Sequence, residues 1–129
     1  MTVADAFGPL LNAFRAANGL PALAVHPLCE RAAQDHAADQ ARREVLTHGS
    51  GFENRDTAAN RIGALGYRWG FAAENVAFGQ RDMQAVLDAW ANSPGHRANM
   101  LAGQAVHYGF GGASNRLGPY WVLVLAAPM

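Results

Sequence analysis

The chain contains no lysine, a single cysteine and no excess charge of either sign. Its 129 residues carry ten acidic and ten basic side chains, and all ten basic side chains are arginine. A chain of zero net charge with scattered arginines lacks the basic patch that binds nucleic acid or an anionic membrane, so we expect no nucleic-acid partner. With Cys29 alone, an intrachain disulfide and a cysteine metal cluster are both excluded.

Long apolar runs are absent as well. No stretch of about 18 apolar residues occurs, so we expect no membrane-spanning helix. The first residues, MTVADAFGPLL, have neither the basic n-region nor the long apolar h-region of a secretion signal. The composition does support folding, because half of the residues are hydrophobic and the length suits one domain with a proper core.

Apolar residues recur at helical spacing along much of the chain. Met83, Val86, Leu87 and Trp90 fall at i, i+3, i+4 and i+7, which predicts an amphipathic helix with Trp90 in the core. Pro9 suits the first turn of the N-terminal helix. Together the patterns predict helices over residues 7–17, 27–45, 57–66, 83–90 and 94–101.

Three segments have the composition of strands. Residues 72–78 form one, and residues 106–114 and 120–128 form an antiparallel hairpin joined by the turn sequence NRLGP. So few strands do not suffice for a parallel sheet. The sequence therefore predicts an α+β fold in which helices pack on a small antiparallel sheet.

Three polar side chains stand where they can do chemistry. His48 lies in a loop rich in Gly, Ser and Asn (residues 46–56), His96 begins a short helix after the turn residues Ser-Pro-Gly, and Glu74 lies in an apolar strand. A carboxylate there must be hydrogen-bonded, paired or solvated. The three could hold a divalent metal with water completing the shell, or Glu74 could orient a histidine from behind. Spacing alone is weak evidence, because no H-E-x-x-H motif occurs.

The remaining polar groups of interest have simpler interpretations. We expect His26 to be a turn or cap residue, His36 to be a hydrogen-bonded core histidine, and His107 to be half exposed at a strand edge. Ser93 is expected to cap the helix that begins at Pro94. Cys29, in an alanine-rich helix, is expected to be a buried and inert thiol.

Several segments together resemble the bacterial branch of the CAP superfamily, also called SCP, PR-1-like or allergen V5-like. From about residue 10 to residue 127 they are, in order, LLNAFRAANGLPAL, HAADQA, LTHGS, GYRWGFAAENVAFGQ, VLDAWANSPGHRANML, HYGFGGA and GPYWVLVLA. The resemblance implies a single CAP domain over residues 1–129. Its implied architecture is a three-layer α-β-α sandwich with a small, mostly antiparallel central sheet.

The resemblance also implies a central cleft with a tetrad of two histidines and two acids. His48 in LTHGS matches the first histidine, His96 in SPGHR the second, and Glu74 in AENVA the first glutamate, although alanine replaces the more usual glycine before it. The second acid is missing, because Ser93 stands at its position. A carboxylate from Glu53 in the loop is the other candidate.

The resemblance implies that the two histidines can hold a divalent cation such as zinc, so His48 and His96 are expected to bind zinc weakly. Glu74 would then act as a general base or orient His96 through a hydrogen bond. Three functions remain open: an exported module, periplasmic or extracellular, that binds a small molecule, lipid or cell-envelope ligand; a metal-assisted hydrolase of peptide or cell-wall material, with His48, Glu74 and His96 catalytic; and a structural or interaction domain with a vestigial site. We expect a monomer.

Overall fold

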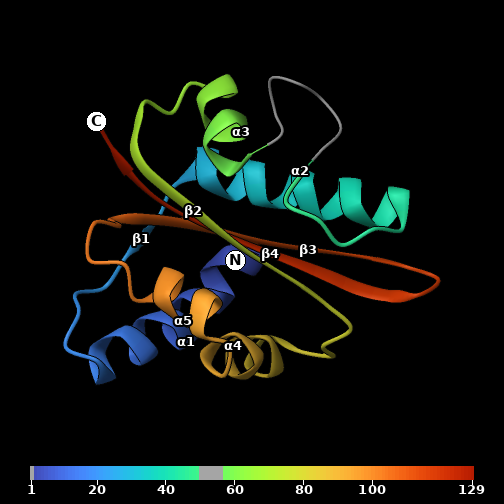
Figure 1. The fold of residues 1–129 in the computed structure, drawn as a ribbon, viewed down its shortest axis with the longest axis horizontal. Coiled ribbons are helices and arrows are strands. Elements are labelled where there is room, and N and C mark those ends of the chain that lie inside the picture. The colour runs from blue at the N-terminus through green and yellow to red at the C-terminus, as the bar shows by residue number, and fades with distance from the viewer. Residues whose placement is uncertain (1, 50–56) are drawn as a thin grey trace.

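The computed structural model describes residues 2–49 and 57–129. Two layers of helices enclose one central sheet, with α2 and α3 on one side and α1, α4 and α5 on the other (Figure 1). This is the expected α+β, three-layer arrangement. The elements are α1 (Val3–Ala17), β1 (Ala24–Val25), α2 (Pro27–Arg43), α3 (Ala58–Ala64), β2 (Trp69–Phe78), α4 (Met83–Ala91), α5 (Pro94–Met100), β3 (His107–Asn115) and β4 (Gly118–Pro128).

The sheet has the strand order β1-β3-β4-β2. The β3–β4 hairpin and the β2–β4 pair are antiparallel, as predicted, whereas β1 pairs with β3 in parallel. No sequence pattern indicated β1, because a strand of two residues is too short to show a period. In the part of the chain that the structure describes, β2 has a strand neighbour on one side only, so its other edge is available to helices and loops.

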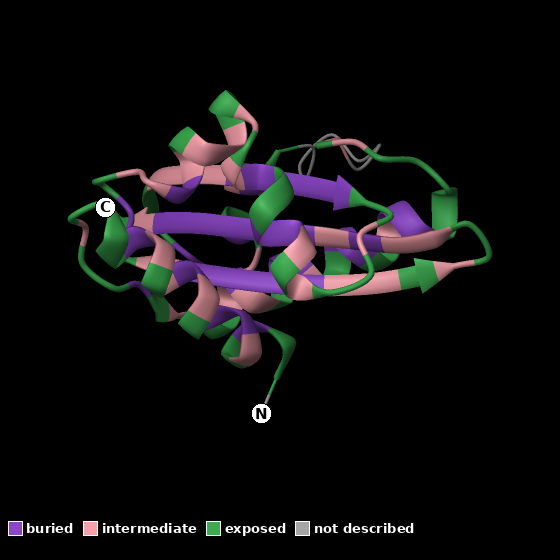
Figure 2. Ribbon diagram, turned by 90° about the horizontal axis from the view of Figure 1, so that it is seen from below, coloured by how far each residue is buried: buried purple, intermediate pink, exposed green. Residues whose placement is uncertain are grey.

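Strand β4 is buried on both faces, and its side chains alternate between two cores. Val122, Val124 and Ala126 face α2 and α3, whereas Leu123 and Leu125 face α1 and α4. Figure 2 shows buried residues concentrated along the strands and on the inner sides of the helices. The continuous apolar run of the last strand is therefore explained by burial on two sides.

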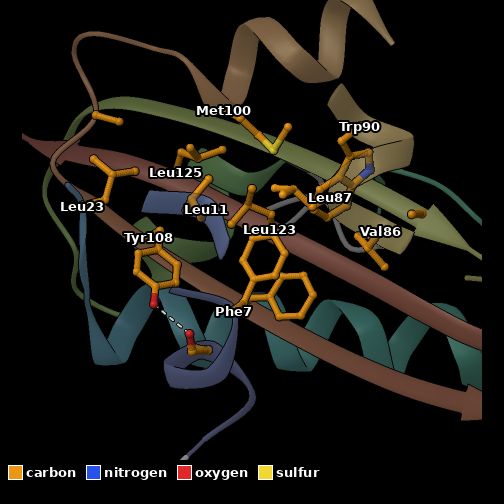
Figure 3. Close-up of a cluster of buried hydrophobic side chains, with 14 residues drawn as sticks. Phe7, Leu11, Leu23, Val86, Leu87, Trp90, Met100, Tyr108, Leu123 and Leu125 are labelled. Carbon is orange, nitrogen blue, oxygen red and sulfur yellow. Dashed lines mark hydrogen bonds between the residues drawn. The ribbon is translucent and has the colours of Figure 1, made fainter. Parts of the chain in front are cut away.

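The core beneath α1 and α4 contains large side chains. Phe7 stacks on Phe110 with ring centroids 4.0 Å apart, and Leu11, Val86 and Trp90 belong to the same cluster (Figure 3). Trp90 is 2% exposed, and its indole N–H donates to the carbonyl of Val76 at 3.1 Å. The prediction that Trp90 is a core residue is confirmed.

The N-terminal helix begins earlier than the sequence suggested. Thr2 caps α1 by accepting from the backbone N–H of Asp5, and the Asp5 carboxylate in turn accepts from the backbone N–H of Thr2. This capping box places Pro9 inside the helix, so the prediction that it occupies the first turn is wrong. The Tyr108 hydroxyl donates to the Ala4 carbonyl at 2.7 Å and holds this first turn on the sheet (Figure 3).

The structural interpretations of His26, His36 and Cys29 are confirmed. His26 caps α2, where its Nδ1 accepts from the Leu28 N–H, and His36 is buried with its Nε2 hydrogen donated to the Thr47 carbonyl. Cys29 is buried, and burial raises the pKa of its thiol to about 12. His107 is half-buried as expected, but it lies between β1 and β4 rather than at a sheet edge, and its Nδ1 contacts the Tyr67 hydroxyl.

Within the described residues, no helix has both the length and the apolar character needed to cross a membrane. This agrees with the absence of a long apolar run in the sequence.

Candidate functional site

Glu74 is the buried centre of the site. It lies in the middle of β2, is 8% exposed and faces α2 and α3. Its Oε1 lies 3.0 Å from Nδ1 of His48, and its Oε2 accepts a hydrogen bond from the guanidinium of Arg61. A buried carboxylate is tolerated when it is paired and hydrogen-bonded, and both conditions hold here. Glu74 was expected to lie within hydrogen-bonding reach of at least one of the two histidines, and the one it contacts is His48. The alternative in which Glu74 orients His96 through a hydrogen bond does not hold.

The loop that carries His48 is held by its backbone. His36 of α2 donates to the Thr47 carbonyl at 2.7 Å, and Gln40, one turn further along α2, accepts from the Thr47 N–H at 2.8 Å. Arg61 of α3 donates to the carbonyl of His48 at 2.8 Å. His36 and Gln40 of α2 therefore position this loop. The side chain of His48 itself remains 60% exposed.

His96 is presented by α5 from the other helical layer. Its Nδ1 lies 3.0 Å from the hydroxyl of Ser93, and its carbonyl accepts from the side-chain amide of Asn75 at 2.9 Å. Asn99 donates to Oδ1 of Asn75 at 2.9 Å and to the Glu74 carbonyl at 3.2 Å. These amides fasten α5 to the edge strand and so fix where His96 stands.

The alternation of β2 explains how the two layers contribute to one site. Glu74 and Asn75 are neighbours in the strand and point to opposite faces of the sheet. Glu74 holds His48 on the α2–α3 side, and Asn75 holds the backbone of His96 on the α5 side. Because β2 is the edge strand of the sheet as far as the structure describes it, His48 and His96 can approach each other around that edge.

The two imidazoles have opposite pKa shifts. The hydrogen bond to Glu74 raises the pKa of His48 above its ordinary value, against an opposing contribution from burial. Burial lowers the pKa of His96, and the positive charge that His48 carries when protonated lowers it further. His48 is therefore the more readily protonated of the two, and its charge is felt at His96.

The donor set fits a metal ion only in part. Each histidine has its Nδ1 directed at a protein partner, Glu74 or Ser93, and within residues 2–49 and 57–129 neither Nε2 makes a hydrogen bond. Anchoring one ring nitrogen in this way is the usual support of a metal-binding histidine. Across the same residues, however, no group of three His, Cys, Asp or Glu side chains is placed to hold a metal. Glu53 lies outside the described residues.

Ser93 does not have the side-chain role expected of it. Its backbone occupies the N-cap position of α5, but its hydroxyl makes no capping hydrogen bond. The hydroxyl contacts His96 instead. The prediction that Ser93 acts as a side-chain cap is wrong, because the imidazole three residues later is the nearer polar partner.

Arg61, Asn75 and Asn99 were missed by the sequence reasoning. Arg61 shares the buried face of α3 with Ala58 and Ile62, at i, i+3 and i+4. Arg61 on an apolar helical face and Glu74 in an apolar strand are both charged residues at positions that the pattern predicts to be buried. Two such residues of opposite charge are candidates for a buried ion pair. The two asparagines carry no comparable signal.

Known proteins resemble this chain in both sequence and fold. The family model described as "CAP: Cysteine-rich secretory protein family" matches residues 10–125. The uncharacterized protein YkwD of Bacillus subtilis is 30% identical over 102 residues, which are 79% of this chain but only 39% of that protein. The chain therefore spans well under half the length of this curated relative.

Two solved structures extend the comparison to the fold. An extracellular SCP-domain protein of Bacillus anthracis matches with a TM-score of 0.82 and 26% identity, over 95% of this chain and 39% of that one. An outer surface protein of Borrelia burgdorferi matches with a TM-score of 0.86 and 18% identity, over 97% of this chain and 92% of that one. With the family model covering most of its length and the three-layer fold shared, this chain belongs to the CAP, or cysteine-rich secretory protein, family.

Proposed function

We propose that this chain is an exported CAP-domain binding module in which His48 and His96 hold a divalent metal ion, with zinc the best match to two imidazoles. The observation that carries the proposal is the anchoring of both rings by Nδ1, on Glu74 and on Ser93, which directs each Nε2 away from its protein partner. Export is supported by the extracellular Bacillus anthracis protein that shares the fold.

Among the described residues no third side chain is placed to join the two imidazoles, so the metal would be exchangeable and its remaining positions would be filled by water or by a ligand from outside. When bound, the metal supplies a Lewis acid at which an oxygen or nitrogen atom of a small molecule, lipid or cell-envelope component can attach. The chain's own groups keep the rings in place: Glu74 orients His48, and Ser93 and Asn75 orient His96.

Binding is better supported than hydrolysis. A metal-assisted hydrolase would use Glu74 as its general base, facing the attacking water. Here one carboxylate oxygen is directed at His48 and the other at Arg61, so the geometry favours a positioning role for Glu74. The alternative is a structural or interaction domain with a vestigial site, for which the wild-type protein should bind no zinc.

Calorimetric titration with zinc tests the proposal. Wild-type protein should bind one zinc, and His48→Ala or His96→Ala should weaken binding by at least about tenfold, because loss of a residue that merely supports a ligand already has such an effect. His107→Ala is the control, since His107 lies on β3 and contacts Tyr67. Equal affinity in all four proteins, or no binding by the wild type, would contradict the proposal.

The affinity should also depend on pH in a defined direction. Zinc and a proton compete for His48, and the pKa of His48 is raised by its hydrogen bond to Glu74. Affinity should therefore begin to fall while the pH is still above the ordinary imidazole value of about 6.5. Zinc titrations over a series of pH values measure this. A zinc affinity that stays constant until well below the ordinary imidazole pKa would contradict the prediction.

A further inference from the structure

Arg61 is a buried arginine whose guanidinium reaches two parts of the site. It lies on α3, which packs against β2 (Figure 1), and it is 6% exposed. One terminal nitrogen donates to Oε2 of Glu74, and the other donates to the carbonyl of His48 at 2.8 Å. A planar guanidinium can make both contacts at once because its nitrogens are fixed in a fork.

The contacts of Arg61 close a triangle. Glu74 bonds to the ring of His48 through Oε1, Arg61 bonds to Glu74 through Oε2, and Arg61 bonds to the backbone of His48. Each of the three residues therefore contacts the other two. One rigid group, the guanidinium of Arg61, therefore sets both the position of the His48 backbone and, through Glu74, the orientation of its ring.

The triangle also selects the form of the imidazole. A carboxylate only accepts hydrogen bonds, so Nδ1 of His48 must carry its hydrogen toward Glu74. In the neutral ring this leaves the lone pair on Nε2, which points away from Glu74. The arrangement requires Oε1 of Glu74 to stay turned to His48.

Arg61 holds Glu74 in this orientation through its hydrogen bond to Oε2. Two other positively chargeable groups lie near Glu74: His48 itself, and His36, whose Nε2 is 3.9 Å from Oε1. His36 already donates to the Thr47 carbonyl, and burial lowers its pKa, which favours its neutral form. Among the described residues, Arg61 is the permanently charged partner of Glu74.

We propose that Arg61 is a positioning residue of the site, which through Glu74 and the His48 carbonyl holds His48 in the Nδ1–H tautomer with Nε2 presented for ligation. The inference deepens the proposed function and rests on it for its link to metal binding. The tautomer itself can be measured without any metal.

The experiment compares Arg61→Gln with a matched control, Arg68→Gln, which removes an exposed arginine from the connection before β2. Long-range ¹H–¹⁵N spectra of the apo-proteins at about pH 8.5, where imidazole is neutral, report the His48 tautomer. Zinc titration of the same samples reports the affinity. Wild type and Arg68→Gln should show mainly the Nδ1–H form, whereas Arg61→Gln should show a mixture shifted toward Nε2–H and bind zinc about tenfold or more weakly.

Arg61→Lys keeps the assay usable if Arg61→Gln does not fold. A single ammonium retains the charge beside Glu74 but cannot reproduce the fork that also reaches the His48 carbonyl. We expect a partial tautomer shift and a smaller loss of affinity. A folded Arg61 variant whose tautomer ratio and zinc affinity both equal those of Arg68→Gln would overturn the inference.

The outcomes separate this inference from the proposed function. If the tautomer shifts in Arg61 variants but the wild type binds no zinc, Arg61 positions His48 and the metal proposal fails. If the wild type binds zinc and the Arg61 variants match it in both measurements, the metal proposal stands and Arg61 is only a packing residue.

Discussion

The hydroxyl of Ser93 is directed at the site rather than at the helix it precedes. It lies 3.0 Å from Nδ1 of His96, and it makes no hydrogen bond to an N–H of α5. A neutral hydroxyl can orient the ring, but it adds no charge. The family resemblance implies an acid at this position, so the serine is a natural place to strengthen the site.

Replacing Ser93 with glutamate should tighten zinc binding. A carboxylate beside Nδ1 of His96 is the stronger support for a metal-binding ring, and such partners are typically worth about 10–100-fold in affinity. Because no side-chain cap is lost, the free energy of unfolding of the apo-protein should change by less than about 0.5 kcal/mol. Calorimetry and urea unfolding measure the two effects.

The control for Ser93→Glu is Asn92→Glu, which adds the same charge one residue earlier at an exposed position. It should leave zinc affinity nearly unchanged. If both variants bind zinc like the wild type, position 93 does not serve the metal site, even though its hydroxyl contacts His96.

The packing of α2 on the sheet depends on two glycines of β3. A Cβ added at Gly109 would lie 2.1 Å from the backbone carbon of Cys29, and one at Gly111 would lie 2.6 Å from Cα of Gln34. These are contacts with helix backbone, which a rotamer change cannot relieve. The helix therefore sits directly on the strand, and from there it places His36 and Gln40 against the loop of His48.

Gly109→Ala should separate α2 from β3 and destabilise the protein by about 3 kcal/mol or more, at or beyond the upper end of ordinary overpacking. Urea unfolding gives the change in free energy. Gly103→Ala is the matched control, because an added Cβ there meets nothing within 4 Å. A similar small effect of both substitutions would show that α2 does not lie as close to the sheet as described.

The histidines make the stability of the domain depend on pH. Burial lowers the pKa values of His36, His96 and His107, whereas the hydrogen bond to Glu74 raises that of His48. As the pH falls below about 6.5, the unfolded chain takes up protons at His36, His96 and His107 before the native protein does. Each of these three histidines therefore lowers the free energy of unfolding. His48 has the opposite effect, because its native form binds the proton more tightly.

We therefore expect the free energy of unfolding to fall as the pH drops below about 6.5, where the unfolded chain takes up protons at His36, His96 and His107 before the folded protein does. Urea unfolding with a chelator present measures it. His107→Gln should flatten the decline, whereas His48→Gln should steepen it because the opposing contribution is lost. A stability that rises on acidification, or an equal slope in both variants, would contradict these assignments.

Much of the fold followed from local patterns. The stripe of Met83, Val86, Leu87 and Trp90 predicted α4, and the apolar runs around NRLGP predicted the hairpin of β3 and β4. Such periods persist because each element must bury one face, whatever its partner. Element ends were less accurate: α1 begins at Val3 and not near residue 7, since its start depends on the cap at Thr2.

The candidate site was only partly visible in the sequence. His48, Glu74 and His96 were named because polar residues stood in a loop, a strand and a helix start, and because those segments resemble one family. Their partners were not named. Glu74 contacts His48, and Ser93 contacts His96, because these side chains are close in the folded protein. Such distances cannot be calculated from the spacing of the residues along the chain.

Composition and periodicity alone determined an α+β chain with apolar helical faces and strands, a single cysteine and zero net charge, because these properties are sums or repeats along the chain. The pairing of Arg61 with Glu74, the parallel strand β1 and the clamp of His36 and Gln40 on Thr47 required the folded chain. Each joins residues whose contact exists only after the helices have packed on the sheet. Burial then makes such contacts obligatory, because a charge or amide removed from water must find its partner inside the protein.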